Sequence, residues 1–202
     1  MSKKKSRVVP LLVMLNLTLF FSVHQIYGEN RSVAKIAKHS YDAFSIFAGY
    51  GTGNLKFKQS DYNYIHTGLK FAWELGRNQE RPYTKGATFF EIAPFVNSVT
   101  NPSSGVEVGC KFLFKHLFLL KNSFYLYLEA GVAPTYITKG TREQSDRFNF
   151  GDEVGIGIQK FINRNKAYWL GYVFRHLSNT GTKQPNGGIN THSILVGSTF
   201  YF

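Results

Sequence analysis

The stretch Val106-Glu107-Val108-Gly109-Cys110-Lys111-Phe112-Leu113-Phe114-Lys115 decides the fold class of this chain. Successive side chains of a β-strand point to opposite faces, so as a strand this stretch separates apolar from charged groups. The apolar face carries Val106, Val108, Cys110, Phe112 and Phe114. The charged face carries Glu107, Lys111 and Lys115. Such a strand fits a sheet that has one apolar and one polar side.

The same alternation recurs along the chain after residue 42, in stretches of about ten residues or slightly more. Polar segments rich in Gly, Asn, Ser, Thr and Lys separate them. The eight expected strands cover approximately residues 43–52, 62–75, 87–98, 105–116, 124–136, 148–161, 167–178 and 191–202.

Eight amphipathic strands predict an all-β fold: a closed, eight-stranded antiparallel β-barrel in a bacterial outer membrane. The barrel must close because an open edge in lipid would leave backbone groups unpaired. The chain ends in Tyr201-Phe202, an ending typical of outer-membrane barrels. The alternative on pattern alone is a soluble, lipocalin-like barrel whose apolar face points inward.

The N-terminus indicates a secretory signal peptide. Its positive region contains Lys3, Lys4, Lys5 and Arg7, and an apolar stretch follows over residues 8–21. We expect cleavage after Gly28, which gives a signal peptide at 1–28, an N-terminal polar segment at 29–41 and a transmembrane barrel domain at 42–202. A permanent N-terminal membrane helix is the alternative, although the stretch is shorter than the ~20 residues of a typical span.

Composition and charge narrow the classes of function. At 202 residues the chain allows one domain, and 43% hydrophobic residues are too many for a disordered chain. The single cysteine excludes an internal disulfide and a cysteine-based zinc site. Loss of residues 1–28 lowers the formal charge from +12 to about +8. In a secreted chain we expect this excess to meet anionic lipid or glycolipid phosphates, and not nucleic acid.

Two polar residues stand at the end of an apolar strand face. An even number of strands places both termini in the periplasm, so the strand at 167–178 ends at the cell surface. His176 and Ser178 share a face with the aromatic and aliphatic residues at 168, 170, 172 and 174, whereas Arg175 points to the other side. If that face meets lipid, the pair needs an explanation, because a barrel requires no polar group there. An esterase that attacks a membrane lipid from the side would need a histidine base beside a serine.

The residues around this pair resemble those of a known family. The run Phe174-Arg175-His176-Leu177-Ser178-Asn179, followed by Lys183-Gln184-Pro185-Asn186-Gly187-Gly188-Ile189 and the terminal Phe202, is similar to the outer-membrane lipid A 3-O-deacylases. The resemblance implies an eight-stranded barrel whose lipid-facing His and Ser hydrolyse the ester of the 3-hydroxyacyl chain at position 3 of lipid A, without a metal or other cofactor.

Carried over residue by residue, the resemblance makes His176 the general base and Ser178 the nucleophile. Asn179 or Asn186 would help to stabilise the oxyanion. Arg175 and Lys183, as basic residues near the outer rim, would hold lipid A phosphates.

One position departs from the family pattern. The family has a Glu fourteen residues after the His, and this chain has Asn190. An amide can orient an imidazole, but it stabilises the imidazolium less than a carboxylate does. His192 shares the face of Asn190, and we expect it to be a rim residue. Asp152 and Glu153 would suggest glycosidic chemistry, but neighbouring side chains of a strand point to opposite faces, so we interpret them as barrel residues.

The competing function is a non-catalytic small barrel that serves adhesion, binding or membrane anchoring. In that case His176 and Ser178 are ordinary residues of the membrane interface. The sequence leaves open which acyl chain is removed, and whether the chain forms a homodimer.

Overall fold

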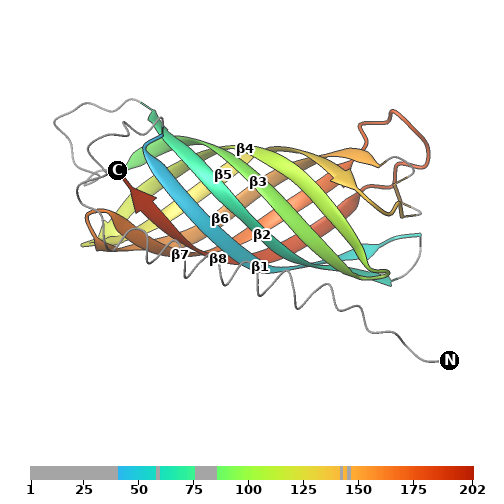
Figure 1. Cartoon of the computed structure of the whole chain (residues 1–202), viewed down its shortest axis with the longest axis horizontal. Helices are drawn as coiled ribbons and strands as arrows, with labels where there is room; N and C mark the ends of the chain where they lie inside the picture. Colours follow the sequence, from blue (N-terminus) through green and yellow to red (C-terminus); the bar gives the residue numbers. More distant parts are fainter. Residues whose placement is uncertain (1–40, 58–59, 76–85, 142, 145–146) are drawn as a thin grey trace, which may run out of the picture. The chain divides into compact units, whose positions relative to one another are not determined.

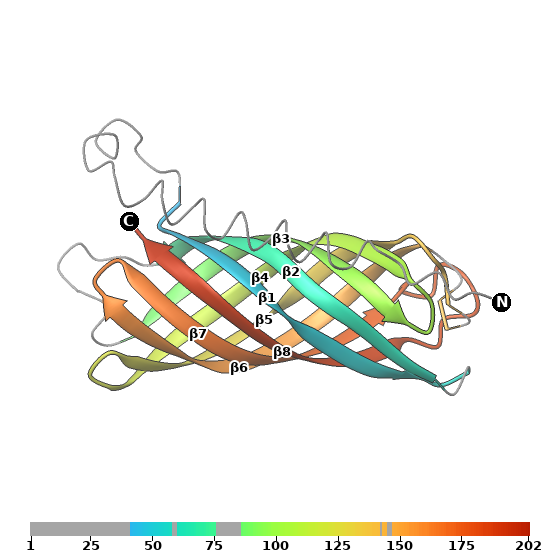
Figure 2. The ribbon, with the colours of Figure 1, turned by 60° about the horizontal axis from the view of Figure 1, so that its bottom comes forward.

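The computed structural model describes residues 41–57, 60–75, 86–141, 143–144 and 147–202. The expected signal peptide, residues 29–40 of the N-terminal segment and residues 76–85 lie outside the described residues. Within them the chain forms eight antiparallel strands in a closed barrel, each paired with the next and the last paired with the first. This confirms the expected fold class, and Figure 1 and Figure 2 show the closed wall from two sides.

The observed strands extend several of the expected ones. The additions lengthen the barrel wall at both ends, and the eighth strand begins two residues earlier than predicted. The strands are β1 (Ala43–Leu55), β2 (Ser60–Leu75), β3 (Ala87–Asn101), β4 (Gly105–Lys121), β5 (Phe124–Ile137), β6 (Phe148–Asn163), β7 (Lys166–Ser178) and β8 (Ile189–Tyr201).

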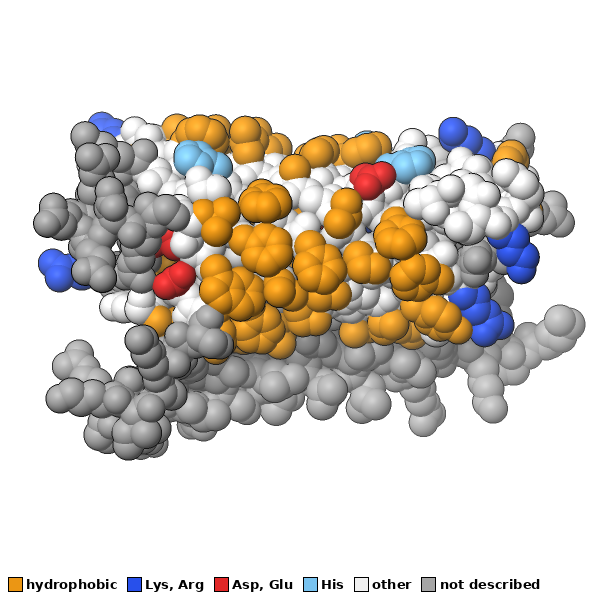
Figure 3. Space-filling view, turned by 90° about the horizontal axis from the view of Figure 1, so that it is seen from above, with side chains coloured by type: hydrophobic (Ala, Val, Ile, Leu, Met, Phe, Trp, Pro, Cys, Tyr) orange, Lys and Arg blue, Asp and Glu red, His pale blue; other side chains and the backbone are white. Residues whose placement is uncertain are grey.

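Alternation along the strands separates the outside of the barrel from its interior. In β4, Phe112 and Phe114 point outward and are 38% and 59% exposed, whereas Lys111 and Lys115 are buried. Figure 3 shows the resulting hydrophobic surface over the wall of the barrel. This arrangement is the opposite of a soluble, lipocalin-like barrel, whose apolar side chains point inward. It gives the lateral surface the apolar band that a membrane barrel presents to lipid.

The barrel interior combines buried apolar and aromatic side chains with charged ones, and its charges balance. Four buried cations and four buried carboxylates of the strands lie within it. Lys70 contacts Glu129 at 2.6 Å and Glu91 at 3.0 Å. Lys111 contacts Glu153 at 2.7 Å. Buried cations need such partners because an unpaired charge is costly to remove from water.

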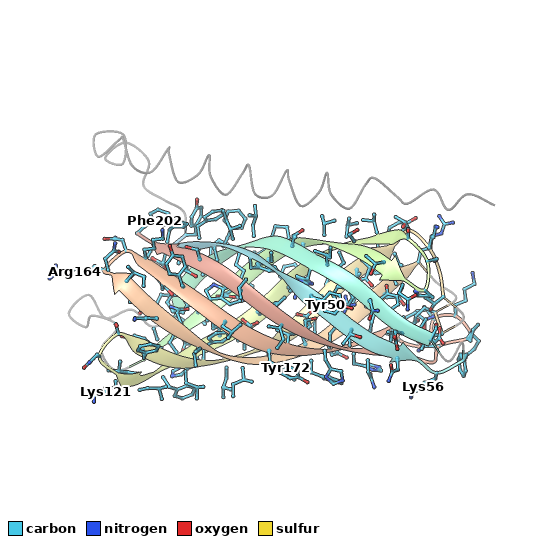
Figure 4. The ribbon with its side chains drawn as sticks, turned by 90° about the horizontal axis from the view of Figure 1, so that it is seen from below. Tyr50, Lys56, Lys121, Arg164, Tyr172 and Phe202 are labelled. Atoms are coloured by element: carbon cyan, nitrogen blue, oxygen red, sulfur yellow. The ribbon has the colours of Figure 1, made fainter. Side chains whose placement is uncertain are left out.

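The two ends of the barrel differ in the length of their connections. β4 and β5 are joined by two residues, as are β6 and β7, whereas residues 138–147 and 179–188 form longer connections at the other end. Short turns are periplasmic and longer loops extracellular in barrels of this kind. Figure 4 shows Lys121, Arg164 and Phe202 at one end of the barrel and Lys56 at the other. The connection between β2 and β3 is longer than this rule expects for a periplasmic turn.

Among the described residues, no helix is long and apolar enough to cross a membrane.

Candidate active site on the barrel wall

His176 and Ser178 lie at the outer end of β7. Burial alternates along this strand, with Arg175 and Leu177 buried and the two candidate residues only partly buried. His176 and Ser178 therefore share the outward face with Tyr172 and the other apolar residues that the sequence placed there. Figure 4 labels Tyr172 on the barrel wall between the two ends. The site is thus on the side of the barrel and not in its interior.

The imidazole of His176 is hydrogen-bonded to Asn190. The distance from His176 Nδ1 to Asn190 Oδ1 is 2.6 Å, and the two residues are directly opposite each other in the pairing of β7 with β8. An amide oxygen can only accept, so in this arrangement Nδ1 carries the proton. In the neutral ring, Nε2 then has the free lone pair that a general base requires.

The loop between β7 and β8 packs closely against the imidazole of His176. Gly188 has a positive φ of 67°, and a Cβ built there would lie 2.6 Å from Cε1 of His176. Both facts favour glycine at this position. The backbone of the loop therefore approaches the imidazole more closely than any side-chain-bearing residue would allow.

Two residues of the β5–β6 loop contact the β7–β8 loop and the end of β7. The Gly187 amide donates to the carbonyl of Glu143 at 2.8 Å, and Gln144 Nε2 donates to the carbonyl of Leu177 at 3.1 Å. Glu143 Oε1 also accepts from the amide of Phe57 at 2.8 Å. Sequence reasoning missed Glu143 and Gln144, because contacts between loops carry no local pattern.

The side chain of Ser178 is partly buried on the outward face of β7 and has no hydrogen-bond partner among the described residues. The positions of His176 and Ser178 are separated by roughly 6.5 Å along the strand. An imidazole extends over much of that distance. Nucleophile and base often become aligned only when substrate binds, so the arrangement is compatible with a Ser-His pair.

The two asparagines that the sequence proposed for the oxyanion differ in what they contact. The Asn179 side chain is 1% exposed; its Nδ2 donates to the carbonyl of Lys183 at 2.8 Å and its Oδ1 accepts from the amide of Gly181 at 3.0 Å. These contacts hold the side chain of Asn179 within the loop, and its expected oxyanion role stays a prediction. Asn186 Oδ1 accepts a hydrogen bond from the amide of Asn179 at 3.2 Å. Its Nδ2 donates no hydrogen bond to any of the described residues.

The two basic residues expected to bind phosphate, Arg175 and Lys183, lie in different environments. Arg175 points into the barrel, where it is 2% exposed and its Nη1 lies 2.8 Å from Glu107 Oε2. The prediction that Arg175 binds lipid phosphate is therefore wrong, because its guanidinium lies on the opposite side of the strand from His176. Lys183 is exposed in the β7–β8 loop at the outer end, where a headgroup can reach it.

His192 lies next to this site on β8 but has a different partner. Its Nδ1 is 2.6 Å from the hydroxyl of Tyr172, and its ring lies 5.4 Å from that of Phe174. Asn190, and not His192, contacts His176.

A closed barrel with an apolar wall, and with a His-Asn pair near a serine at its outer end, defines an outer-membrane β-barrel with a candidate hydrolase site facing the lipid. The model of the lipid A 3-O-deacylase (PagL) family matches residues 44–199. The chain belongs to this family and is located in the bacterial outer membrane.

Solved structures show the same fold. The outer membrane enzyme PagL is 19% identical, with a TM-score of 0.58, over 77% of this chain and 97% of that chain. Neisserial surface protein A is 12% identical, with a TM-score of 0.51, over 79% of this chain and 96% of that chain. No curated protein sequence matches this chain. None of these matches supports the homodimer that the sequence left open.

Proposed function

We propose that this chain is a serine esterase that hydrolyses the ester of the 3-hydroxyacyl chain at position 3 of lipid A. The hydrogen bond between His176 Nδ1 and Asn190 Oδ1, 2.6 Å long and on the lipid-facing side, carries the proposal, because a structural barrel has no need to orient a histidine there. The family supplies the substrate class. The outward position of Ser178 supplies the access, since lipid A reaches such a site by moving within the outer leaflet.

In the first half of the proposed reaction, Ser178 Oγ attacks the ester carbonyl. His176 Nε2 takes the hydroxyl proton, and Asn190 keeps the ring oriented while it becomes positively charged. Asn186 Nδ2 is the proposed oxyanion donor, because its amide is not committed elsewhere among the described residues. Collapse of the tetrahedral intermediate breaks the ester bond, and the sugar oxygen leaves with the proton from His176.

In the second half, water completes the reaction. His176 takes a proton from a water molecule, which attacks the acyl-serine and forms a new bond to the carbonyl carbon. Collapse of this second intermediate breaks the bond between the carbonyl carbon and Ser178 Oγ, which takes back the proton from His176. The products are a free 3-hydroxy fatty acid and regenerated Ser178. Exposed Lys183 is proposed to bind a lipid A phosphate, so that its loss would weaken substrate capture more than the chemical step.

Alanine substitution tests the two residues on which the chemistry depends. Ser178→Ala and His176→Ala should each lower the release of 3-hydroxy fatty acid from lipid A by roughly 10³-fold or more, and the double variant should be about as inactive as either single variant. Mass spectrometry of lipid A incubated with the purified protein in detergent micelles measures both products.

The faster gel migration of an unboiled barrel shows whether each variant is folded. Removal of a polar side chain from the outer wall opens no interior cavity, so both variants should keep the faster migration of a folded barrel. Folded alanine variants that deacylate at the parent's rate would contradict the assignment of Ser178 and His176. A folded parent that leaves lipid A intact would favour the non-catalytic barrel.

A further inference from the structure

Asp152 places a carboxylate on the lipid-facing wall. It lies near the start of β6, in an outward row with Phe150 and Val154, which are 37% and 55% exposed. Its neighbour Glu153 points inward and pairs with Lys111, so the two acids have unrelated surroundings. A charged side chain on this face opposes membrane insertion and calls for a functional reason.

The register of the sheet places Asp152 directly beside the candidate base. Asp152 is opposite His176 in the pairing of β6 with β7, and Asn190 is opposite His176 on the other side, in the pairing of β7 with β8. Directly opposed residues of antiparallel strands have Cβ atoms about 4.5–5.5 Å apart. His176 therefore stands between a carboxylate and an amide in one row across three strands.

Among the described residues, the carboxylate of Asp152 contacts no cation, His176 included. Within the described part of the chain, its carboxylate has no ion pair and no hydrogen bond. On β5 it is opposite Val132, and the titratable Tyr136 further along that strand contacts Arg147 at 3.3 Å. On β7 and β8, Tyr172 and His192 bind each other. His176 is the titratable group directly opposite Asp152.

We infer that Asp152 is a positioning residue for His176 and supplies the negative charge that the amide of Asn190 lacks. The inference rests on the proposed function. In it, Asn190 fixes the orientation of the ring through Nδ1, and Asp152 stabilises the imidazolium that forms as Ser178 loses its proton. The division follows from charge, because an amide can align an imidazole but attracts its positive form only weakly.

Relocation of the charge tests this division of roles. Asp152→Asn should lower kcat about 10- to 100-fold with little change in KM, since the lost interaction is made mainly in the transition state. Asp152→Glu should retain most of the activity. The decisive variant is Asp152→Asn combined with Asn190→Asp, which moves the carboxylate to the other side of the ring and should recover at least tenfold over Asp152→Asn alone.

Asp61→Asn is the matched control, because Asp61 is an exposed, outward aspartate at the same end of the barrel and is not opposite His176. It should keep the parent's kcat. Parent-like kcat in a folded Asp152→Asn variant, or no recovery in the double variant, would overturn the inference while leaving the proposed function in place. A parent without activity, equal to Ser178→Ala in the same assay, would overturn both.

Discussion

Asn190 decides how well the histidine of this chain can act as a base. Its Oδ1 lies 2.6 Å from His176 Nδ1, so Asn190→Ala should free the ring and lower kcat about tenfold to hundredfold. Asn190→Asp has the same shape and should keep or raise activity, because it accepts the same hydrogen bond and adds a charge. Rates of fatty acid release by the three proteins provide the measurement. Equal rates would show that another group orients the ring.

At the scale of the element, the β7–β8 loop packs against the imidazole of His176 and limits where the ring can lie. Gly188→Ala would force a Cβ to within 2.6 Å of the His176 ring in a backbone conformation that alanine rarely adopts. We expect at least a tenfold loss of activity, since small displacements of a catalytic group are costly. Gly181→Ala is a control of similar chemistry: Gly181 also has a positive φ, but a Cβ there has nothing within 4 Å.

The readout for these glycines is fatty acid release by variants that migrate as folded barrels on unboiled gels. Gly181→Ala carries the same kind of backbone strain without a clash at His176, so it separates loop strain from displacement of the ring. If both variants lose activity equally, the close approach of Gly188 to the histidine is not what matters.

The strands could be predicted from the sequence, whereas the contacts that complete the site could not. A period-two pattern such as that of Val106–Lys115 fixes both the strand and its inward face, because only one face of a barrel meets lipid. The inward orientation of Arg175 also follows from the sequence, since Arg175 shares a strand face with Val173, and this orientation is incompatible with a place at the rim. The position of Asp152 opposite His176 depends on the β6–β7 register, which the sequence does not specify. The hydrogen bond from the Gly187 amide to the Glu143 carbonyl depends on how two loops meet in the tertiary structure.

At the scale of the whole molecule, an interior hydrogen-bond network links the strand that carries the site to other strands of the wall. Near the outer end, Glu107 accepts hydrogen bonds from Tyr62, Asn97 and Arg175. The Arg175 guanidinium also lies 4.9 Å from the ring of Tyr64. The strands β2, β3 and β4 are neighbours in the barrel wall, whereas β7 is not adjacent to any of them. The network therefore ties β2, β3 and β4 to β7, the strand that carries His176 and Ser178.

Loss of one member of the Glu107–Arg175 ion pair should therefore destabilise the barrel. Glu107→Gln leaves the Arg175 guanidinium buried without a counter-charge, which should lower the free energy of unfolding by about 3–5 kcal/mol. The double variant Glu107→Met with Arg175→Met removes both charges and should recover most of that loss, because paired buried charges contribute little net stability over apolar groups. Urea titration in lipid vesicles, followed by tryptophan fluorescence, measures each value.

If Glu107→Gln unfolds at the parent's urea concentration, the pair does not stabilise the wall. If the double variant is less stable than Glu107→Gln, the destabilisation comes from lost packing or hydrogen bonds, and not from an uncompensated charge.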